Sequence, residues 1–464
     1  MAEQAKFLEG SLFKHIAVMA ATSSVGLMFV FLVDFVDMIF ISMLGKEELA
    51  AAIGYAGAIL FFTTSFGIGM AIASGALEAR ALGGGGRALA REKSDASMIY
   101  GVLFAAIFAA LVWINIPALA GLMGASGETL ELATMYLRII VPSLPLFVVA
   151  IVGGAVLRAH GDARRSMMAT VAAGLVNAVL DPILIFGFGL DLMGAALASV
   201  AARCAMAVMA LRPIFQHHGG MNWPSMACLW RDFWPLAAIA FPAILTQLAT
   251  PIGQAYVTRS MAEFGEEAVA GMASIARLIP VSFAVIFALS GAIGPIIGQN
   301  YGAKRHDRVE RTFREGMLFT VIVVAVISLG LFLLREPIAA LFQAEGVARS
   351  LLFLFCGPLA LAWFFNGAIF VTNASFNNLG HPFYSTWINW GRHTLGTVPF
   401  VMLGAAWFGA PGVLIGQSVG GAIFAAIAVV LTFRVIRIAR EKDLSEPQPY
   451  QPQARALQLL HNRR

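Results

Sequence analysis

Apolar runs of twenty residues or more succeed one another along almost the whole chain, and only short polar breaks separate them. About 20 apolar residues suffice for a helix to cross the hydrocarbon core of a bilayer. With 59% hydrophobic and only 12% charged residues, the 464-residue chain has too little polar surface to enclose such runs in water. The predicted fold class is therefore an all-α polytopic membrane protein.

The breaks between the apolar runs predict twelve transmembrane helices, six in each half of the chain. The first six are expected at 15–43, 50–80, 97–123, 130–157, 165–187 and 193–216. The second six are expected at 233–262, 268–300, 312–342, 348–377, 382–407 and 411–438. Several runs exceed the length that a perpendicular crossing needs, so we expect tilted helices or helices that protrude into water.

Short sequence matches recur between the two halves at a nearly constant offset. The clearest is Arg80-Ala-Leu-Gly83, which corresponds to Gln299-Asn-Tyr-Gly302 at an offset of 219. Six crossings return the chain to one side, so a repeat of six helices predicts two parallel lobes about an axis along the membrane normal, as in some secondary transporters. The expected domains are an N-terminus 1–14, a lobe 15–216, a loop 217–232, a lobe 233–438 and a tail 439–464.

The charges of the loops alternate along the chain. Six segments, counted from the N-terminus through every second loop to the C-terminal tail, hold about 23 Lys and Arg, whereas the opposite loops hold only Lys46, Arg259, Arg335 and Arg349. Loops rich in Lys and Arg remain in the cytoplasm. We therefore expect a multi-pass protein of a bacterial inner membrane with both termini in the cytoplasm.

Asp181 is an ionisable residue deep inside an apolar run, and it directly precedes Pro182. Asn177 lies four residues earlier, so a helix places both side chains on one face. The proline lacks an N–H and predicts a kink at this point. A carboxylate at bilayer depth costs roughly 2.5–3.5 kcal/mol, and such groups usually face a protein interior or a wet cavity.

The first run carries two further acids, Asp34 and Asp37, of which Asp34 can be interfacial. If Asp37 and Asp181 converge in one cavity, they could take up a proton from one side of the membrane and release it on the other. With Asn177 they could instead supply oxygen ligands for Na⁺. Either form would be a site for a coupling ion.

Other polar residues of the runs have two possible roles each. Ser199 and Arg203 share a helix face, and Ser199 can also serve close helix packing. Arg203 could form a salt bridge with an aspartate of the same cavity, or extend to the cytoplasmic surface. The second half has no acids that match Asp37 and Asp181, and its deep charged or titratable residues are Arg277, Arg392 and His393.

No motif in the sequence points to an enzyme. The glycine run at 83–86 has no following Lys-Ser/Thr and so is no phosphate-binding loop, which removes the signature of an ATP-driven pump. We find no nucleophile–base pair, no metal-ligand spacing and no motif for an organic cofactor. The chemistry expected of the chain is transport.

Five short motifs recur in order along the chain: Val36–Gly45 with Leu49-Ala-Ala, Leu157–Asp162, Asn177–Pro182, Gly194–Ser199 and Gly298–Ala303. Through these motifs the chain resembles, from about residue 15 to 438, the multidrug and toxic compound extrusion (MATE) transporters. It implies two six-helix lobes around a V-shaped cavity and export driven by inward H⁺ or Na⁺. It also implies that Asp37, Asn177 and Asp181 form the cation site, with Ser199 where relatives often carry Thr.

The absence of acids from the second lobe resembles the DinF-like branch of the family more than the NorM-like branch. The expected function is a secondary antiporter, monomeric in the membrane, that exports amphipathic, cationic small molecules in exchange for H⁺ or Na⁺. The alternative is a flippase for lipid-linked or polyprenyl-linked precursors, in which Arg277 and Arg392 would meet an anionic head group. Neither alternative involves nucleic acid.

Overall fold

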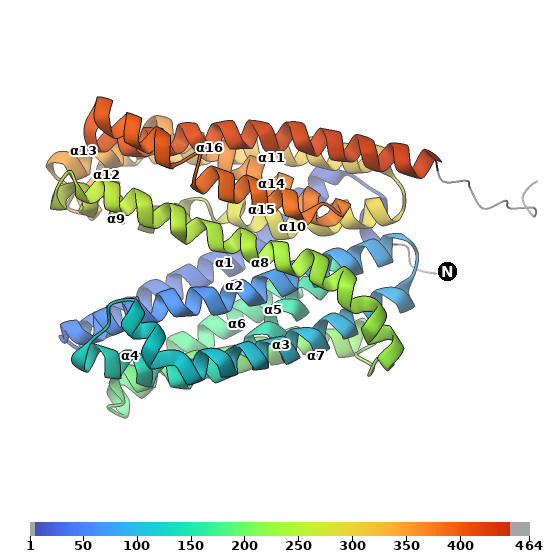
Figure 1. Ribbon diagram of the computed structural model, residues 1–464, viewed down its shortest axis with the longest axis horizontal. Coiled ribbons are helices and arrows are strands. Elements are labelled where there is room, and N and C mark those ends of the chain that lie inside the picture. Colours follow the sequence, from blue (N-terminus) through green and yellow to red (C-terminus); the bar gives the residue numbers. More distant parts are fainter. Residues whose placement is uncertain (1–4, 446–464) are drawn as a thin grey trace, which may run out of the picture.

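The computed structural model describes residues 5–445, and helices make up nearly all of this part of the chain. Figure 1 shows long, roughly parallel helices in two groups, with α2–α7 below and α9–α16 above. The first half contains η1 (Lys6–Leu8), α1 (Leu12–Met43), α2 (Glu47–Gly83), α3 (Arg87–Leu122), α4 (Gly127–Ile140), η2 (Val141–Ser143), α5 (Leu144–Ala159), α6 (Ala163–Pro182), η3 (Ile183–Gly187) and α7 (Asp191–His217). The second half contains α8 (Met226–Ala262), α9 (Glu266–Ser282), α10 (Ala284–Gly302), α11 (His306–Leu333), α12 (Arg335–Leu341), α13 (Gly346–Leu354), η4 (Phe355–Leu359), α14 (Ala360–Leu379), α15 (Pro382–His393) and α16 (Val398–Ser445).

Eleven stretches of these described residues are long and apolar enough to cross a membrane, which confirms a polytopic membrane protein. The sequence predicted twelve, and the difference lies at the end of the chain, where 382–442 counts as one stretch of 61 residues. At 1.5 Å per residue a straight helix of that length would extend about 90 Å, three times the hydrocarbon thickness.

The long last stretch is not straight, because the chain reverses at Gly409. This residue has φ 64° and ψ −145°, a conformation that only glycine adopts readily. On either side of it the backbones pack against each other in antiparallel order: Gly404 on Gly412, Phe400 on Gly416 and Gly396 on Gly420. On the second arm Gly412, Gly416 and Gly420 are four residues apart, and these glycines let the two arms of a helical hairpin approach closely.

Several predicted spans are interrupted rather than continuous helices. The span predicted at 268–300 is formed by α9 and α10, which meet at Phe283 shortly after Pro280. The span predicted at 165–187 is α6 followed by the π-helical turn η3, directly after Pro182. Proline removes a backbone hydrogen bond of a helix, which explains why the helical geometry changes at these points.

Two helices, α1 and α8, each belong to both groups. The first turns of α1, from Leu12 to Ala20, pack in a core made mainly by α10, α11, α14, α15 and α16, to which Phe7 and Ala163 also belong. Conversely Leu236, Ile239 and Ala240 of α8 pack in the core of α2, α3 and α5, while Val257 farther along α8 packs in the second half. The predicted domain boundaries assign each helix to one lobe, and the packing adds that each completes the core of the other.

At one end of the molecule the two groups touch through matching residues. A Cβ atom on Gly83 would lie 1.9 Å from the carbonyl oxygen of Gln299, and one on Gly302 would lie 1.9 Å from that of Arg80. Arg80 Nε donates to the carbonyl of Asn378 at 2.8 Å, and Gln299 Nε2 donates to that of Ala159 at 2.8 Å. At the sequence offset of 219, Arg80 corresponds to Gln299 and Ala159 corresponds to Asn378. Each contact from the first half is therefore matched by the equivalent contact from the second half.

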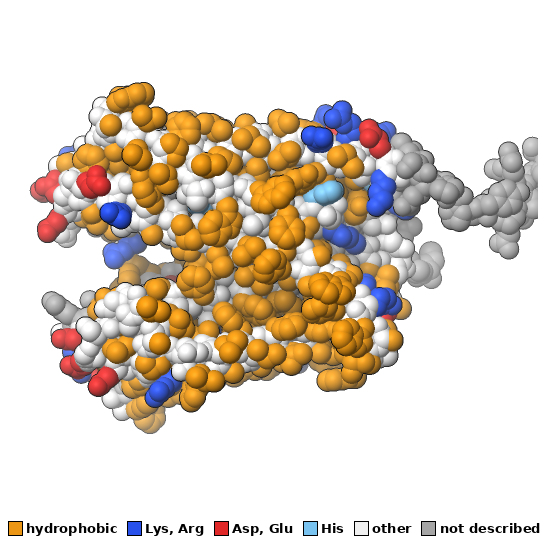
Figure 2. Space-filling view, in the orientation of Figure 1, with side chains coloured by type: hydrophobic (Ala, Val, Ile, Leu, Met, Phe, Trp, Pro, Cys, Tyr) orange, Lys and Arg blue, Asp and Glu red, His pale blue; other side chains and the backbone are white. Residues whose placement is uncertain are grey.

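The opposite end of the molecule is open. Figure 2 shows a cleft between the two groups of helices at the left, while the groups are in contact toward the right, where the N-terminus lies in Figure 1. Acidic side chains gather at the open end, and Lys and Arg gather at the closed end. This separation of charge is the one that the sequence predicted for the two sides of a membrane.

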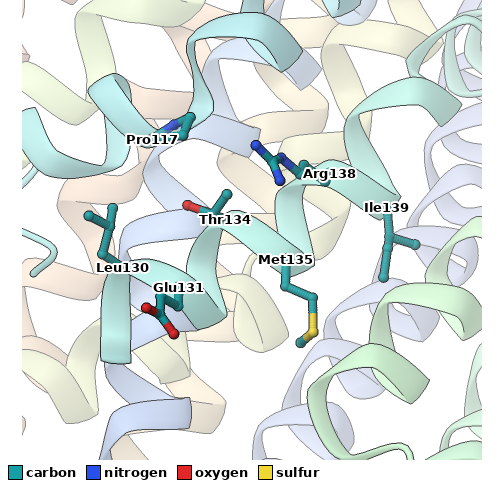
Figure 3. Close-up of a pocket in the computed structure, with 7 residues that line it drawn as sticks. All are labelled: Pro117, Leu130, Glu131, Thr134, Met135, Arg138 and Ile139. Carbon is teal, nitrogen blue, oxygen red and sulfur yellow. The ribbon is translucent and has the colours of Figure 1, made fainter. Parts of the chain in front are cut away.

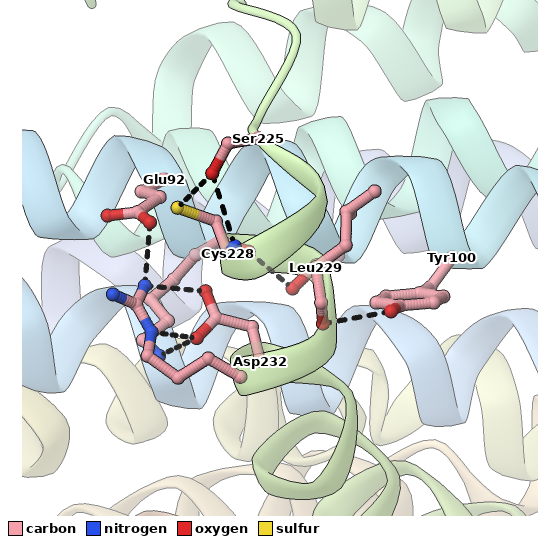
Figure 4. Close-up of polar contacts among 9 residues, drawn as sticks. Glu92, Tyr100, Ser225, Cys228, Leu229 and Asp232 are labelled. Atoms are coloured by element: carbon pink, nitrogen blue, oxygen red, sulfur yellow. Dashed lines mark hydrogen bonds and ion pairs between the residues drawn. The ribbon is translucent and has the colours of Figure 1, made fainter.

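The start of α8 is fastened to α3 by a polar cluster that Figure 4 shows. Asp232 is 2% exposed and accepts from Lys93 and, at 2.8 Å, from Arg231 Nε. Tyr100 donates to the carbonyl of Leu229 at 2.8 Å, and Arg231 also reaches Glu92 at 2.7 Å. The second half is thereby held on the first where the connecting loop ends.

Replacing Asp232 with Asn should destabilise the protein by about 3 kcal/mol, because Lys93, whose side chain is only 15% exposed, would be left without an anionic partner. The matched control is Glu92→Gln, which removes the partner of a half-exposed arginine and should cost less than about 1 kcal/mol. Thermal unfolding of both purified variants in detergent measures the difference. Equal shifts in Tm would contradict this account of the cluster.

Candidate functional site

Helices α1 and α6 bring Asp37, Asn177 and Asp181 together inside the first half. Asn177 Nδ2 donates to Asp181 Oδ2 at 2.5 Å and lies 3.4 Å from Asp37 Oδ2. The two carboxyl groups are also within hydrogen-bonding contact of each other. The structure therefore places on one site the three residues that the sequence singled out.

Local sequence explains how the three side chains reach one another. On α6 the spacing of four residues puts Asn177 and Asp181 on one face, directly before the π-helical turn η3. Gly174, one turn earlier, packs on Phe29 of α1, and a Cβ there would lie 2.6 Å from the ring. The glycine thus lets α1 approach α6 closely enough for Asp37 to join the pair.

The site is buried in the first half. Asp181 is 0% exposed and Asn177 is 7% exposed, while Asp37 is half-buried. Asp181 Oδ1 has no hydrogen-bond partner among the described residues. Two carboxyl groups in contact repel each other when both are ionised, and a proton or a cation between their oxygens would relieve this repulsion.

The remaining predicted residues of the first half lie around this site with different contacts. Asp34 is one helical turn from Asp37 and is exposed. Ser199 is half-buried on α7 and contacts the hydroxyl of Tyr136 on α4, which itself lies within electrostatic reach of both Asp37 and Asp181. Tyr136 was missed by the sequence reasoning, although a tyrosine inside a predicted span was a signal that could have drawn attention to it.

Arg203 makes neither of the contacts that the sequence suggested. Its Nη1 donates to the hydroxyl of Ser143 at 2.9 Å and to the carbonyl of Ile140 at 3.3 Å. The guanidinium lies over the ring of Phe147, 5.2 Å from its centroid. Arg203 thus satisfies the backbone where α4 passes into η2, and it forms no salt bridge with the two aspartates among the described residues.

The two basic residues predicted for the second half differ strongly in how exposed they are. Arg277 is exposed on α9, whereas Arg392 is 9% exposed on α15. In the described chain no three side chains of His, Cys, Asp or Glu cluster as a metal site. Apart from Asp232 at the start of α8, the buried polar side chains described in the second half are amides, hydroxyls, two histidines and Arg392, and none is a carboxylate.

The groove in Figure 3 is separate from the carboxylate site. It lies between α3 and α4 and is lined by Pro117, Leu130, Glu131, Thr134, Met135, Arg138 and Ile139. Its lining includes none of Asp37, Asn177 and Asp181. The groove is mostly apolar and offers no second constellation for a coupling ion.

A second titratable cluster lies at the closed end, where the loop after α7 meets the turn between α5 and α6. His218 stacks on His160 with ring centroids 4.3 Å apart, and its Nε2 lies 3.7 Å from the carboxylate of Asp162. Burial, reinforced by the neighbouring His160, lowers the pKa of His218 to about 4. Burial alone would raise the pKa of Asp162, but the hydrogen bonds from Arg165 outweigh it and lower that pKa.

The low pKa of His218 predicts a loss of stability in mild acid. Between its ordinary value of 6.5 and about 4, the unfolded chain binds a proton that the folded chain does not, so the free energy of unfolding falls as the pH falls through this window. At pH 5 the loss from this group is about 2 kcal/mol. Asp162 acts in the same direction only at lower pH, because its stabilising charge is lost as the pH falls through its depressed pKa.

His218→Gln should remove most of this acid sensitivity, since glutamine stays neutral. The measurement is the difference in Tm between pH 7.5 and pH 5, with the exposed neighbour His217→Gln as control. An unchanged acid response in His218→Gln would show that other groups cause it.

Comparison with known proteins adds three findings. The model of the MatE family matches the chain twice, over residues 23–183 and 242–403. The chain is 28% identical to the FAD transporter of Shewanella oneidensis, over 90% of this chain and 93% of that protein. It is 25% identical to the multidrug export protein MepA of Staphylococcus aureus, over 77% of this chain and 83% of MepA.

The fold also matches a solved structure. A mutant of the Vibrio cholerae MATE transporter VcmN superposes with a TM-score of 0.86 at 25% identity, covering 92% of this chain and 97% of that one. The two matches of the family model together cover more than half of the chain and are separated by nearly the offset of the internal repeat.

Proposed function

Since the chain belongs to the MATE family of membrane transporters, we propose that it is a secondary antiporter that exports amphipathic small molecules in exchange for inward H⁺ or Na⁺. Members of this family are transporters and not enzymes, and the relatives named above are an FAD transporter and a multidrug export protein. An inward unit charge gains about 2.3 kcal/mol per 100 mV of membrane potential, which is enough to drive export against a gradient.

The observation that carries this proposal is the contact among Asp37, Asn177 and Asp181 inside the first half. A pair of buried carboxyl groups is costly unless it binds a proton or a cation. In the proposal Asp37 and Asp181 bind the coupling ion, and Asn177 orients them. Ser199 and Tyr136 border the site, Arg203 influences it through charge, and the exposed Asp34 is not needed for coupling.

Both coupling ions fit the arrangement. One proton shared between Asp37 and Asp181 would relieve their repulsion, and carboxylate and amide oxygens together can also coordinate Na⁺. Arg203 is held at the junction of α4 and η2, so it leaves the aspartates available to either ion.

We propose that twelve helices cross the membrane, in two six-helix lobes related by a parallel repeat. The reversal at Gly409, the reciprocal contacts of Gly83 and Gly302 and the two matches of one family model all support this proposal. The basic closed end is then cytoplasmic, with both termini there, in a bacterial inner membrane. The cleft of Figure 2 then opens away from the cytoplasm, and the transporter acts as a monomer.

The proposal also keeps two finer predictions from the sequence. The second half has no acid at its core, which favours the DinF-like branch, and cationic cargo remains the sequence-based expectation. A lipid-linked flippase is not favoured, because the relatives named above are an FAD transporter and a multidrug export protein.

The test is counterflow and efflux in proteoliposomes with two probes, a cationic dye and FAD. An imposed pH gradient and an imposed Na⁺ gradient are applied separately. We expect one of the two gradients to drive flux of at least one probe, and the other to be without effect. Flux that follows neither gradient would reject ion-coupled antiport.

A further inference from the structure

Helix α15 carries a guanidinium deep in the second half. Arg392 is only 9% exposed, and its neighbour His393 is 6% exposed. Arginine remains charged under all conditions relevant to a protein, so this is a buried positive charge. Burying an ion without compensation costs several kcal/mol.

No acid compensates this charge. From Gly346 to Arg440 the sequence contains no Asp or Glu at all. Arg392 forms no ion pair within residues 5–445; its Nη1 donates to Asn366 Oδ1 at 2.9 Å and its Nη2 to His393 Nε2 at 2.8 Å. A buried charge that neutral groups alone contact marks a functional site by default.

The unused polar atoms of the pair are both donors. Arg392 Nε has no partner within residues 5–445, and neither has His393 Nδ1. Because a guanidinium can only donate, His393 Nε2 must accept from it, so the proton of the neutral ring is assigned to Nδ1. Two adjacent N–H groups, one of them on a cation, call for an acceptor that carries negative charge.

Helix α8 packs closely against the histidine of this pair, and only glycine fits at the point of contact. Gly253 faces the histidine, and a Cβ atom there would lie 2.2 Å from His393 Nδ1. The next residue, Gln254, is exposed and pairs with Gln417 of α16 at 3.5 Å. Gln254 thus places an exposed amide one residue from the contact between α8 and the histidine.

Equivalent helices of the two halves carry a buried charged residue, but the two charges have opposite sign. Helix α15 begins at Pro382, which corresponds to the start of α6 at Ala163 by the offset of 219. Helix α6 bears Asp181 and α15 bears Arg392. One half can thus hold the coupling cation while the other holds an anion.

We propose that Arg392, with Asn366 and His393, binds an oxyanion group, phosphate or carboxylate, of the exported molecule. This inference rests on the proposed export function for the identity of the ligand as cargo, and it replaces the expectation of a purely cationic cargo. An inside-negative potential favours the entry of a cation and also the exit of an anion. The potential therefore drives both movements of such an exchange.

The test is a binding titration with FMN and riboflavin, which share one ring system and differ by a phosphate. Purified protein in detergent is titrated against each flavin without any gradient, and fluorescence is recorded. We expect FMN to bind at least about tenfold more tightly than riboflavin, equivalent to about 1.4 kcal/mol. Arg392→Gln should abolish this ratio while the affinity for riboflavin stays unchanged, and Arg392→Lys should retain part of it.

Controls separate binding from folding. Arg314→Gln changes a surface arginine that pairs with Glu310 and should leave the ratio intact. Inorganic phosphate and acetate, added as competitors, tell a phosphate site from a carboxylate site. Equal binding of both flavins to the unaltered protein, or equal weakening of both in Arg392→Gln, would overturn the proposal.

The outcome is independent of the antiport test. Discrimination between the flavins without ion-driven flux would reject the export proposal and leave the anion site standing. Ion-driven flux of a cationic dye without any such discrimination would do the reverse.

Discussion

Asp181→Asn is expected to reduce ion-driven transport to the level of protein-free liposomes while the protein still folds and inserts. Asparagine keeps the shape of the side chain and its contact with Asn177, but it can neither bind a proton at neutral pH nor supply a negative charge to a cation. Asp37→Asn should have the same effect, because the pair acts as one unit. The measurement is gradient-driven flux in proteoliposomes at matched protein density.

Two neighbouring acids serve as controls for the loss of charge. Asp34→Asn lies one turn from Asp37 on α1 but is exposed, and Asp191→Asn removes only a surface pair with Lys46. Both variants should transport at rates within about twofold of the unaltered protein, since exposed pairs contribute little. Normal ion-driven flux in both Asp37→Asn and Asp181→Asn would eliminate this site as the site of coupling.

Gly302→Ala should stop transport by preventing closure of the end where the two halves meet. The new Cβ atom would lie 1.9 Å from the carbonyl oxygen of Arg80 and 2.8 Å from its carbonyl carbon. Both are backbone atoms, so no rotamer change relieves the clash and helices α2 and α10 must separate. Overpacking of this kind costs about 3 kcal/mol.

The neighbouring Gly84 provides a matched control. A Cβ there would lie 3.5 Å from the nearest carbonyl oxygen, which is ordinary contact, and its φ of −72° suits alanine. Gly84→Ala should therefore change Tm by no more than about 1 °C, whereas Gly302→Ala and its counterpart Gly83→Ala should each lower Tm by several degrees. Unaltered flux and Tm in Gly302→Ala would show that this contact is not needed in the transport cycle.

Much of the carboxylate site could be predicted from sequence because its signals are local. The spacing of Asn177 and Asp181, followed by Pro182, defines a polar face and a disturbed helix without any tertiary information. The offset of 219 similarly identified Arg80–Gly83 and Gln299–Gly302 as equivalent segments. That these two segments touch each other follows from the arrangement of the halves and needed the structure.

Long side chains and irregular helices could not be predicted in the same way. Arg203 can extend in several directions, and its position depends on the carbonyl of Ile140. The break between α4 and α5 leaves this carbonyl free to accept a hydrogen bond from the arginine. The role of Tyr136 depends on how α4 faces α1 and α7. The reversal at Gly409 was predicted as a gap between two spans, but the close packing of its arms depends on glycines whose partners lie on the other arm.

The shared helices α1 and α8 have a consequence for the biosynthesis of the protein. As the chain leaves the ribosome, the first half lacks Leu236, Ile239 and Ala240 of its core until α8 has been made. The start of α1 likewise remains without its neighbours until α10–α16 follow. The two halves must therefore mature together, and a gene divided between α7 and α8 would encode two fragments that each need the other to finish folding.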